Sequence, residues 1–386
     1  MLTGVVKMDR FFYPVGQGAF YREKFILNNN EVFNVIYDCG TMTTHQGNKN
    51  IVDVIDNWDT QRVDILFISH FHQDHISKLS YLIKKTHPKL VVMPFLTDLE
   101  KYYFEIGLLY SNLDKQIADI DFRRIMESMD FIDNPYRYLQ KNEIKEVLFI
   151  AKEKNIENKN DNLIVVPEGD LFTQKDKIKL FESYDKFWVF DTFVSPQFNR
   201  KSVVDNFNKN VCNIKEIICN PDKVREILSS NDYKNKIKKI YGKNINEMSM
   251  TLYSGPTNND VFYQQATKRN VCKCFYTKNA GCLYTGDYNA NKKDLYDDLM
   301  NHFSIYNNKI GCLQLPHHGS NDNFNDGFLK LDCFYIACVG ENNKYGHPGN
   351  IVVNKIMKNN KPLFIVTENT SELLLKVRKV SNCKCQ

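Results

Sequence analysis

The pattern of apolar and polar positions predicts strands near the start of the chain. Extended, aromatic-rich runs fill residues 5–38, and glycine- and asparagine-rich turn signals interrupt them at residues 16–18 and 28–30. A short and almost continuous apolar run at residues 63–68 suits a buried strand, and it stops at Ser69. We therefore expect the fold to open with a meander that leads into a buried strand.

A polar run at residues 69–75 lies between that strand and a predicted helix. Residues 76–85 have helical spacing, and residues 89–94 have the pattern of another strand. The polar run is therefore expected on a strand-to-helix loop. Loops held between rigid elements are where functional residues usually lie.

The middle of the chain, residues 96–240, has a different character. It contains long, charged, amphipathic stretches, such as residues 117–129 and 142–154, and a strand-like piece at residues 187–193. Residues 233–243, rich in Asn and Lys, are expected to form an exposed loop. Together these features predict a large mixed, mainly helical insertion.

Strands return in the last third of the chain, and helices predicted at residues 292–303 and 350–359 separate some of them. The expected strands cover residues 248–253, 271–276, 281–284, 311–315, 333–338, 362–366 and 371–380. Strands at both ends, with helices between and outside them, predict an α+β fold of two sheets covered by helices.

Composition limits the classes of protein to which the chain can belong. Hydrophobic residues make up 42% and aromatic residues 13% of the 386 residues, which is enough apolar surface for a core. The 51 basic and 46 acidic residues give a net charge of +5, too small an excess to identify a nucleic-acid partner. A polyanionic substrate stays compatible with this charge, because only the field around a site must be positive.

Cysteine usage and hydropathy bear on the compartment. The 11 cysteines are odd in number and lack paired CxxC spacings, so reduced thiols in a cytosol are expected. The N-terminus has no apolar core of signal-peptide length, and no later segment approaches the ~20 apolar residues of a membrane helix. These observations predict a soluble, cytoplasmic protein without a membrane partner.

The polar loop carries the residues with the strongest chemical signal. In an extended segment His70 and His72 point the same way, so their two imidazoles can bind one cation. Asp74 and His75 turn toward a second cation. Three histidines and one aspartate directly after a buried strand are typical of a metal site, and far less so of a loop that merely caps a helix.

Other candidate residues lie in the last third of the chain. Asp287 follows an apolar strand and a glycine, a pair that is also common in solvated turns. An apolar strand leads to His317 and His318, and alternation alone does not choose which of them would be a ligand. His347 precedes Pro348 in an extended conformation, where it could line a pocket mouth or be an ordinary loop histidine.

These motifs resemble those of a known family. Residues 70–75 resemble the HxHxDH signature of the metallo-β-lactamase superfamily, and matches follow in order at residues 284–287 (YTGD) and 315–320 (LPHHGS). Together with residues 15–18 (VGQG) and 345–348 (YGHP), they are most similar to the ComEC-like group, which includes phosphorylcholine esterases. The resemblance implies an αββα sandwich.

The resemblance also implies a division of the chain and a set of roles. Residues 1–95 and 241–386 would form the two halves of the sandwich around the insertion at residues 96–240, which we expect to lie beside the metal cleft. Asp287 would bridge two metals and His318 would complete the second site, which leaves His317 to contact a substrate oxygen.

The sequence departs from the family pattern at two places. Many members complete the first metal site with a mid-chain histidine, but this chain has no histidine between His87 and His302, so the first site is expected to be poor in ligands. Ala19 stands where an acidic residue often follows the VGQG segment. The expected metal ligands are His70, His72, Asp74, His75, Asp287 and His318.

The predicted function is a metal-dependent hydrolase that uses a hydroxide activated by two divalent metals, zinc by default and manganese as the alternative. Asp74 would orient the attacking water, and His317 and His347 are the other candidate catalytic residues. The favoured substrate is a phosphodiester, with nucleic acid or a nucleotide as examples. A carbonyl hydrolase acting on a lactone, thioester or lactam is one alternative, and a metal-stabilised binding module without activity is the other.

Overall fold

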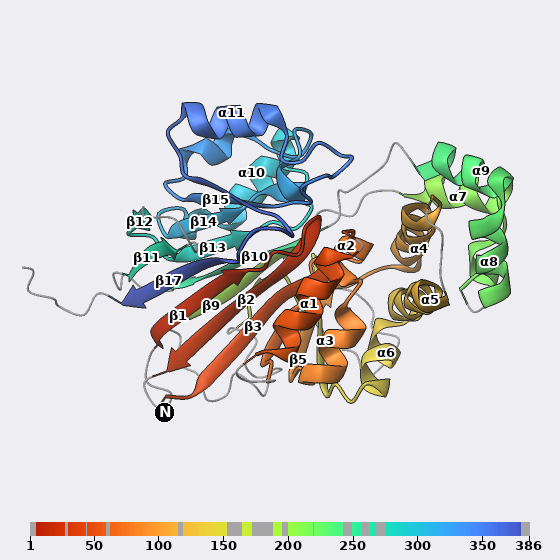
Figure 1. Cartoon of the computed structure of the whole chain (residues 1–386), viewed down its shortest axis with the longest axis horizontal. Coiled ribbons are helices and arrows are strands. Elements are labelled where there is room, and N and C mark those ends of the chain that lie inside the picture. Colours follow the sequence, from red (N-terminus) through yellow and green to blue (C-terminus); the bar gives the residue numbers. More distant parts are fainter. Residues whose placement is uncertain are drawn as a thin grey trace, which may run out of the picture.

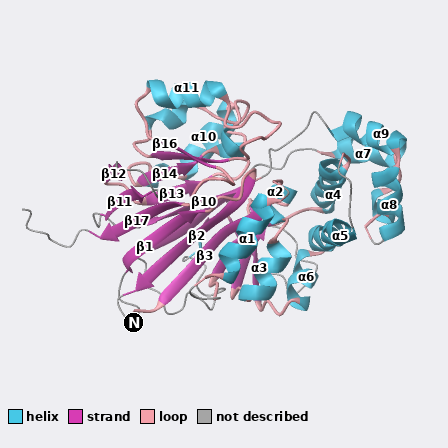
Figure 2. Ribbon diagram, in the orientation of Figure 1, coloured by secondary structure: helices cyan, strands magenta, loops and turns pink. Residues whose placement is uncertain are grey.

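Two sheets form the centre of the computed structural model (Figures 1 and 2). The structure describes residues 5–27, 30–43, 45–58, 62–114, 119–152, 164–171, 188–194, 200–218, 220–241, 249–256, 262–267 and 275–379. No helix in these ranges is long and apolar enough to cross a membrane.

The first sheet contains the predicted N-terminal meander. Its strands are β1 (Val5–Phe12), β2 (Gly18–Leu27), β3 (Val32–Thr41), β4 (Ile65–Phe67), β5 (Leu90–Pro94), β6 (Glu146–Ala151), β7 (Ile164–Pro167), β11 (Phe262–Thr267), β12 (Phe275–Thr277) and β17 (Leu373–Lys379). They lie in the order β12-β11-β17-β1-β2-β3-β4-β5-β6-β7. Pairing is antiparallel from β12 to β3 and parallel from β3 to β7. The C-terminal ends of strands β3 and β4 therefore lie side by side at one edge of the sheet.

The second sheet faces the first. Its strands are β8 (Gly169–Asp170), β9 (Trp188–Val194), β10 (Met250–Pro256), β13 (Gly281–Tyr284), β14 (Ile310–Gln314), β15 (Phe334–Cys338) and β16 (Leu363–Val366). They lie in the order β16-β15-β14-β13-β10-β9-β8, and the strands from β13 to β16 are parallel. Buried side chains from both sheets form one apolar cluster between them.

Helices cover the outer face of each sheet, which gives the predicted αββα layering (Figure 2). The helices on the first sheet and beside it are α1 (Gln46–Asp56), α2 (Gln73–Ile76), α3 (Leu79–Thr86), α4 (Asp98–Asn112), α5 (Asp119–Asp133), α6 (Pro135–Lys141), α7 (Lys201–Asn210), α8 (Pro221–Ser229) and α9 (Asn231–Tyr241). On the second sheet lie α10 (Lys293–His302) and α11 (Asn350–Lys358). Each side has its own apolar cluster between helices and sheet.

The segment predicted as an insertion has two kinds of structure. Helices α4, α5, α7, α8 and α9 gather at one end of the molecule (Figure 1). The same segment also supplies β6 and β7 to the first sheet and β8 and β9 to the second. The boundaries at residues 96 and 240 stay a prediction, but part of this segment belongs to the sandwich.

Two local predictions within this segment are wrong. The amphipathic stretch at residues 142–154 contains β6, because pairing with β5 and β7 buries its apolar run. Residues 233–243 were expected to form a loop, yet α9 extends to Tyr241. Ile237 and Tyr241 lie one turn apart on its buried face, and this spacing supports a helix despite the lysines around it.

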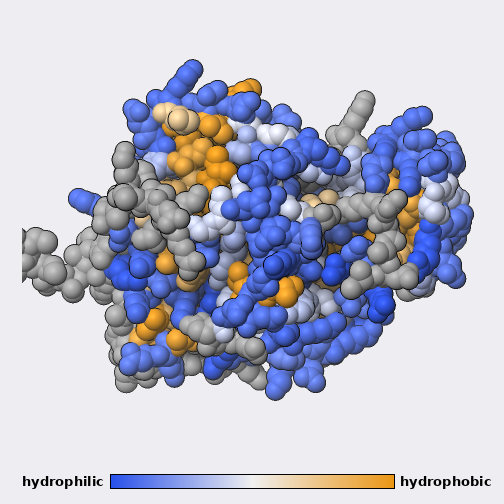
Figure 3. Space-filling model, viewed as in Figure 1, coloured by the Kyte–Doolittle hydropathy of each residue, from blue (hydrophilic) through white to orange (hydrophobic). Residues whose placement is uncertain are grey.

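The surface is mainly hydrophilic on the face drawn in Figure 3, with separate apolar patches. The exposed large apolar side chains of the described residues are Ile164, Ile305, Tyr345, Ile351, Met357 and Ile365. Apolar residues scattered singly are normal on a protein surface, so most of these require no partner. Tyr345 differs from the others because it also lines the cavity beside the histidine cluster.

Candidate metal centre

The histidine loop begins where β4 ends, and a buried aspartate fixes its first residue. Asp38, three positions before the final residue of the adjacent strand β3, accepts hydrogen bonds from the backbone N–H and the hydroxyl of Ser69, both at 2.7 Å. His72 is the N-cap of the short helix α2, so Asp74 and His75 lie in that helix's first turn. The predicted strand-to-helix position of the loop is confirmed.

The first group of converging side chains consists of His70, His72 and Asp287. One candidate ligand atom from each lies within 4.8 Å of the others. His70 Nε2 stands 3.5 Å from Asp287 Oδ2, and both side chains are 1% exposed. Asp287 comes from the loop after β13 of the second sheet, so this group forms only when the two sheets meet.

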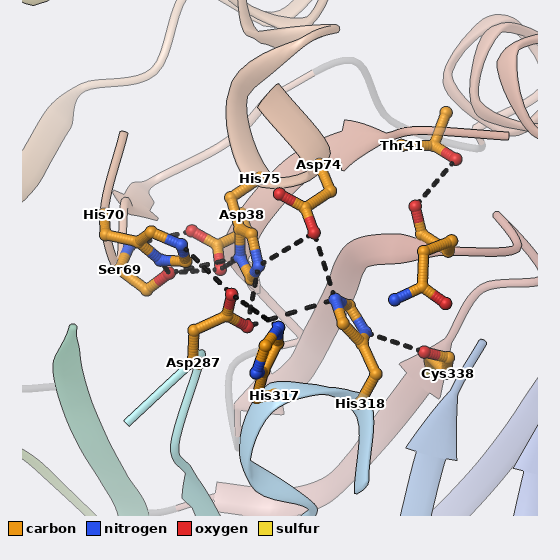
Figure 4. A network of polar contacts seen from close by, with 12 residues as sticks. Asp38, Thr41, Ser69, His70, Asp74, His75, Asp287, His317, His318 and Cys338 are labelled. Atoms are coloured by element: carbon orange, nitrogen blue, oxygen red, sulfur yellow. Dashed lines mark hydrogen bonds and ion pairs between the residues drawn. The ribbon is translucent and has the colours of Figure 1, made fainter. Parts of the chain in front are cut away.

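A second group shares the same aspartate. Asp74, His75, Asp287 and His318 also bring one ligand atom each within 4.8 Å of one another. His75 Nε2 lies 3.2 Å from Asp287 Oδ1, and His318 Nε2 lies 3.2 Å from Asp74 Oδ2. Because Asp287 directs one oxygen toward each group, its carboxylate lies between two potential cation positions (Figure 4).

The donor set fits cations by a direct physical test. Four buried atoms of these two groups have no hydrogen-bond partner among the described residues, namely His70 Nε2, His75 Nε2 and both carboxylate oxygens of Asp287. Unpartnered buried polar atoms are costly and rare in native structures. Imidazole nitrogens and carboxylate oxygens are common ligands of zinc, so divalent cations would satisfy these atoms.

Contacts behind the histidines aim their free nitrogens at this centre. His75 Nδ1 donates to Asp38 Oδ2 at 2.7 Å, and His318 Nδ1 donates to the carbonyl of Cys338 at 2.8 Å. His70 Nδ1 lies 2.9 Å from the Ser69 hydroxyl. When Nδ1 carries the proton, Nε2 presents its lone pair, which is the form that a metal ligand needs.

Electrostatics at the centre favour a neutral His72 and a charged Asp287. Burial, followed by the nearby His70, lowers the pKa of His72 to about 3. Burial raises the pKa of Asp287, but His317, His75 and His70 outweigh it and hold that pKa well below the ordinary value. These protonation states are those of metal ligands.

The pKa of His75 indicates an excess of negative charge around its ring. Burial lowers its pKa, yet Asp287, Asp38 and Asp74 outweigh burial and raise the pKa well above the ordinary value. Three carboxylates around one imidazole therefore favour a positive charge at this point. A divalent cation would supply that charge in place of a proton.

The LPHHGS segment places its two histidines differently. Both have left-handed backbone conformations, with φ of 47° for His317 and 57° for His318, an uncommon state that clusters at functional sites. His318 is 1% exposed and belongs to the second group, whereas His317 is 19% exposed and lines the cavity above it. His317 Nδ1 donates to Asn323 Oδ1 at 3.0 Å, and its Nε2 lies 3.8 Å from Asp287 Oδ2.

His347 also lies at this cavity. Its ring centroid is 5.0 Å from that of His317, and its Nδ1 is 3.3 Å from Gln17 Nε2. Burial, then the neighbouring His317 and His318, lowers the pKa of His347 to about 3. The structure therefore brings all predicted site residues together, although their roles stay predictions.

The centre opens into a cavity of about 410 Å³. Its lining residues are Gln17, Met42, His72, Asp74, Tyr110, Ser111, Tyr241, Asn289, His317, Ser320, Asp322, Asn323, Tyr345 and His347. A second cavity of about 510 Å³ shares part of this wall and is also lined by Asp114, Lys238, Lys344 and Glu368. Its two lysines are matched by two acids, so this region has no excess of positive charge.

Sequence reasoning missed several residues of the centre. Asp38 lies near the C-terminal end of β3, at the same edge as the histidine loop, and that position was an available signal. Ser249 accepts a hydrogen bond from the Asp287 backbone N–H at 2.9 Å, which no sequence pattern indicated. Tyr110 and Tyr241 reach the cavity from α4 and α9, elements of the predicted insertion. The other histidines lie elsewhere, with His45 and His87 exposed and His302 bonded to Asp191.

Comparison with known proteins agrees with this architecture. Residues 26–129, which contain the histidine loop, match the sequence profile described as the metallo-beta-lactamase superfamily. Together with the two helix-covered sheets, this match decides the fold. The chain has the metallo-β-lactamase fold. The distinctive HxHxDH loop lies within the matched segment.

Other relatives of this metallo-β-lactamase-fold chain are distant. It is 29% identical over 124 residues to the cleavage and polyadenylation specificity factor subunit 3-I of Arabidopsis thaliana, which is 31% of this chain and 18% of that protein. The metallo-beta-lactamase fold protein YhfI of Bacillus subtilis is 7% identical, with a TM-score of 0.36 over 95% of this chain and 98% of YhfI. The Rm3 metallo-beta-lactamase is 10% identical, with a TM-score of 0.27 over 79% of this chain and 76% of that chain. Structural likenesses of this size support no functional conclusion.

Proposed function

We propose that this protein is a metal-dependent hydrolase of phosphodiester bonds, with nucleic acid or a nucleotide as its substrate. The observation that carries the proposal is the position of Asp287 between two groups of ligands. His70 and His72 complete one group, whereas Asp74, His75 and His318 complete the other. Two divalent cations held there would supply Lewis acidity and activate a water as the nucleophile.

Residues of the chain would orient the attacking water and protonate the leaving group. The Asp74 side chain is 15% exposed and lines the cavity, which supports a role in orienting the attacking water. His317 donates from Nδ1 to Asn323, so its Nε2 is the atom that faces substrate. In the imidazolium form, Nε2 can give a proton to the leaving-group oxygen.

Two observations favour a phosphodiester over a carbonyl substrate. Tyr345 is 48% exposed at the cavity and its ring stacks on His347 at 5.8 Å, a surface suited to packing a nucleobase. The Arabidopsis thaliana relative is named as a polyadenylation factor, and polyadenylation is chemistry on a phosphodiester-linked chain. The ComEC-like pattern of the later motifs points the same way.

A substrate screen with and without metal tests the proposal. Protein reconstituted with zinc or manganese should contain close to two metals per chain, as measured by elemental analysis. It should hydrolyse bis-nitrophenyl phosphate, DNA or RNA, lose this activity on chelation and regain it when metal is restored. Exposed His45 provides the matched control, since His45→Ala should leave metal content and activity unchanged.

Other outcomes separate the alternatives. Turnover confined to lactones, thioesters or lactams would assign the same centre to a carbonyl hydrolase. Metal binding without turnover of either class would favour a metal-stabilised binding module. Protein that binds no metal after reconstitution would contradict the metal centre itself.

A further inference from the structure

The second cavity adjoins the candidate metal centre, and the proposed hydrolysis does not use it. It shares part of its wall with the first cavity, and the shared residues are Gln17, Met42, Tyr110, Ser111 and Tyr345. A molecule bound at the metal centre can therefore reach the second cavity along a common wall. The two volumes, about 410 and 510 Å³, each lie within the range of small-molecule sites.

The wall of the second cavity comes from two parts of the fold. Tyr110 and Ser111 lie on α4, and Lys238 lies on α9. The loop at residues 340–347, which follows β15 of the second sheet, supplies another side of the wall. A group bound in this cavity would therefore contact both the helical segment and the sandwich.

Hydrogen bonds order the loop that carries Tyr345. The Asn343 amide donates to the carbonyls of Gly340 and His347, both at 2.7 Å, and accepts from the backbone N–H of His347 at 2.9 Å. The rings of Tyr345 and His347 stack with their centroids 5.8 Å apart and their planes 26° apart. Tyr345 is nevertheless 48% exposed, so it presents open surface to the two cavities that it lines.

The charges of the second cavity suit an uncharged group better than a phosphate. Lys238 is already paired with Asp114, whose Oδ1 lies 2.7 Å from the lysine Nζ. The Nζ of Lys344 lies 5.4 Å from the centroid of the Tyr345 ring, and Glu368 adds a second acid to the wall. A phosphate there would meet as many acids as lysines. A nucleobase is uncharged and has a face that stacks on an aromatic side chain.

We propose that the second cavity binds the nucleobase next to the phosphodiester bond that the protein would hydrolyse, and that Tyr345 stacks on this base. The inference rests on the proposed phosphodiester hydrolysis and defines its substrate more closely, as a nucleotide or a single strand of nucleic acid. Bases inside a duplex are paired and stacked on one another, so their faces are not open to a tyrosine. The protein should therefore hydrolyse single strands faster than duplexes.

Two synthetic esters with the same leaving group test this site in metal-reconstituted protein. One is the nitrophenyl ester of thymidine 5′-phosphate, and the other is methyl nitrophenyl phosphate, which has no base. Tyr345→Ala should raise KM for the thymidine ester about 5- to 150-fold, the range expected for one stacked base, and change kcat little. The methyl ester should keep its wild-type KM in this variant. Tyr345→Phe retains an aromatic ring and should restore the KM of the thymidine ester.

A binding measurement examines the same site without turnover. In the presence of a chelator, fluorescence anisotropy should show that wild-type protein binds a labelled oligothymidylate more tightly than an abasic strand of equal length and charge. Tyr345→Ala should remove this difference, and Tyr345→Phe should retain it. Ile305→Ala is the matched control and should behave as wild type, because Ile305 is 71% exposed and lines neither cavity.

The outcomes distinguish the base site from the proposed function. If both esters are hydrolysed and Tyr345→Ala leaves both KM values unchanged or raises them equally, the base site is wrong and the hydrolase stands. Equal binding of the thymidine and abasic strands by wild-type protein would also overturn the base site. If neither ester nor any nucleic acid is hydrolysed, the proposed function fails, and the difference in anisotropy alone decides whether the base site exists.

Discussion

Two buried clusters of charged groups lie in this molecule, and they differ in how completely their atoms are paired. Between the two sheets, Arg10 donates to Glu23 at 2.7 Å, to Gln264 at 2.6 Å and to two backbone carbonyls. Glu23 also accepts from Ser254 and Tyr284. This cluster is complete without any other group.

The metal centre has similar burial but leaves atoms of His70, His75 and Asp287 without hydrogen bonds. Burying a charge is costly unless it is paired, and these atoms contact one another at 3.2 to 3.5 Å without forming a hydrogen bond. The difference teaches that burial and charge do not by themselves mark a functional site. A buried polar cluster that is incomplete within the protein is the one that points to a ligand.

The largest expected effect comes from removing a ligand of the incomplete cluster. His72→Ala and Asp74→Ala should each lower hydrolysis at least ~1000-fold, since loss of a central catalytic group has effects of this size or more. Metal content should fall with His72→Ala, while circular dichroism should show an intact fold. Near wild-type turnover of either metal-loaded variant would show that the site is assigned incorrectly.

Disrupting the complete cluster around Arg10 should lower the stability of the protein and leave its metal binding unchanged. Arg10→Met leaves the carboxylate of Glu23 buried without its cation, which should cost about 3 to 5 kcal/mol of unfolding free energy in urea denaturation. Metal content per folded chain should stay unchanged. Lys238→Ala is the exposed counterpart, because Lys238 pairs with Asp114 in solvent, and it should cost less than about 1 kcal/mol. Equal losses of unfolding free energy in Arg10→Met and Lys238→Ala would contradict this expectation.

A third experiment distinguishes the expected metal ligand His318 from its neighbour His317, which is expected to contact substrate. His318→Ala should reduce occupancy of the second metal, because it removes a coordinate bond. His317→Ala should keep both metals and lose about 2 to 4 kcal/mol of transition-state stabilisation. Metal content and turnover must be measured on the same samples. Loss of metal in His317→Ala but not in His318→Ala would exchange the two roles.

The last prediction concerns Glu105, an unpaired carboxyl that stands apart from the candidate metal centre. Both of its side-chain oxygens are buried and have no hydrogen-bond partner, and burial, followed by Asp133, raises the pKa of Glu105 to about 9. A lone carboxyl therefore takes up a proton, because it is not part of a group of candidate ligands.

This raised pKa predicts a pH dependence of stability. The contribution of Glu105 is fully present below its unfolded pKa of about 4.3 and is lost as pH rises through about 9. Wild type should therefore lose up to ~1.4 kcal/mol per pH unit in that window relative to Glu105→Gln. Urea denaturation of both proteins near pH 6 and pH 8 measures the difference. Parallel pH profiles would show that the Glu105 carboxyl is ionised in the folded protein.

Much of the fold could be predicted because the information is local. The strands at residues 63–68 and 89–94 are short apolar runs, and the structure confirms both as β4 and β5. The prediction failed in the middle of the chain, where pairing between distant segments decides the outcome. Residues 146–151 are a strand because β5 and β7 flank them, and nothing within the stretch itself required this.

The sequence by itself determined the chemistry of the centre. Residues 70–75 place four potential ligands on one loop, and their spacing alone indicates cations. Only the tertiary structure decided which distant side chains contact these residues. Asp38 and Tyr241 lie 37 residues before His75 and 169 residues after His72, and their contacts exist because β3 lies beside β4 and α9 packs on α4. A few neighbouring residues determine the types of candidate ligand, whereas their orientation depends on side chains that folding brings from far along the chain.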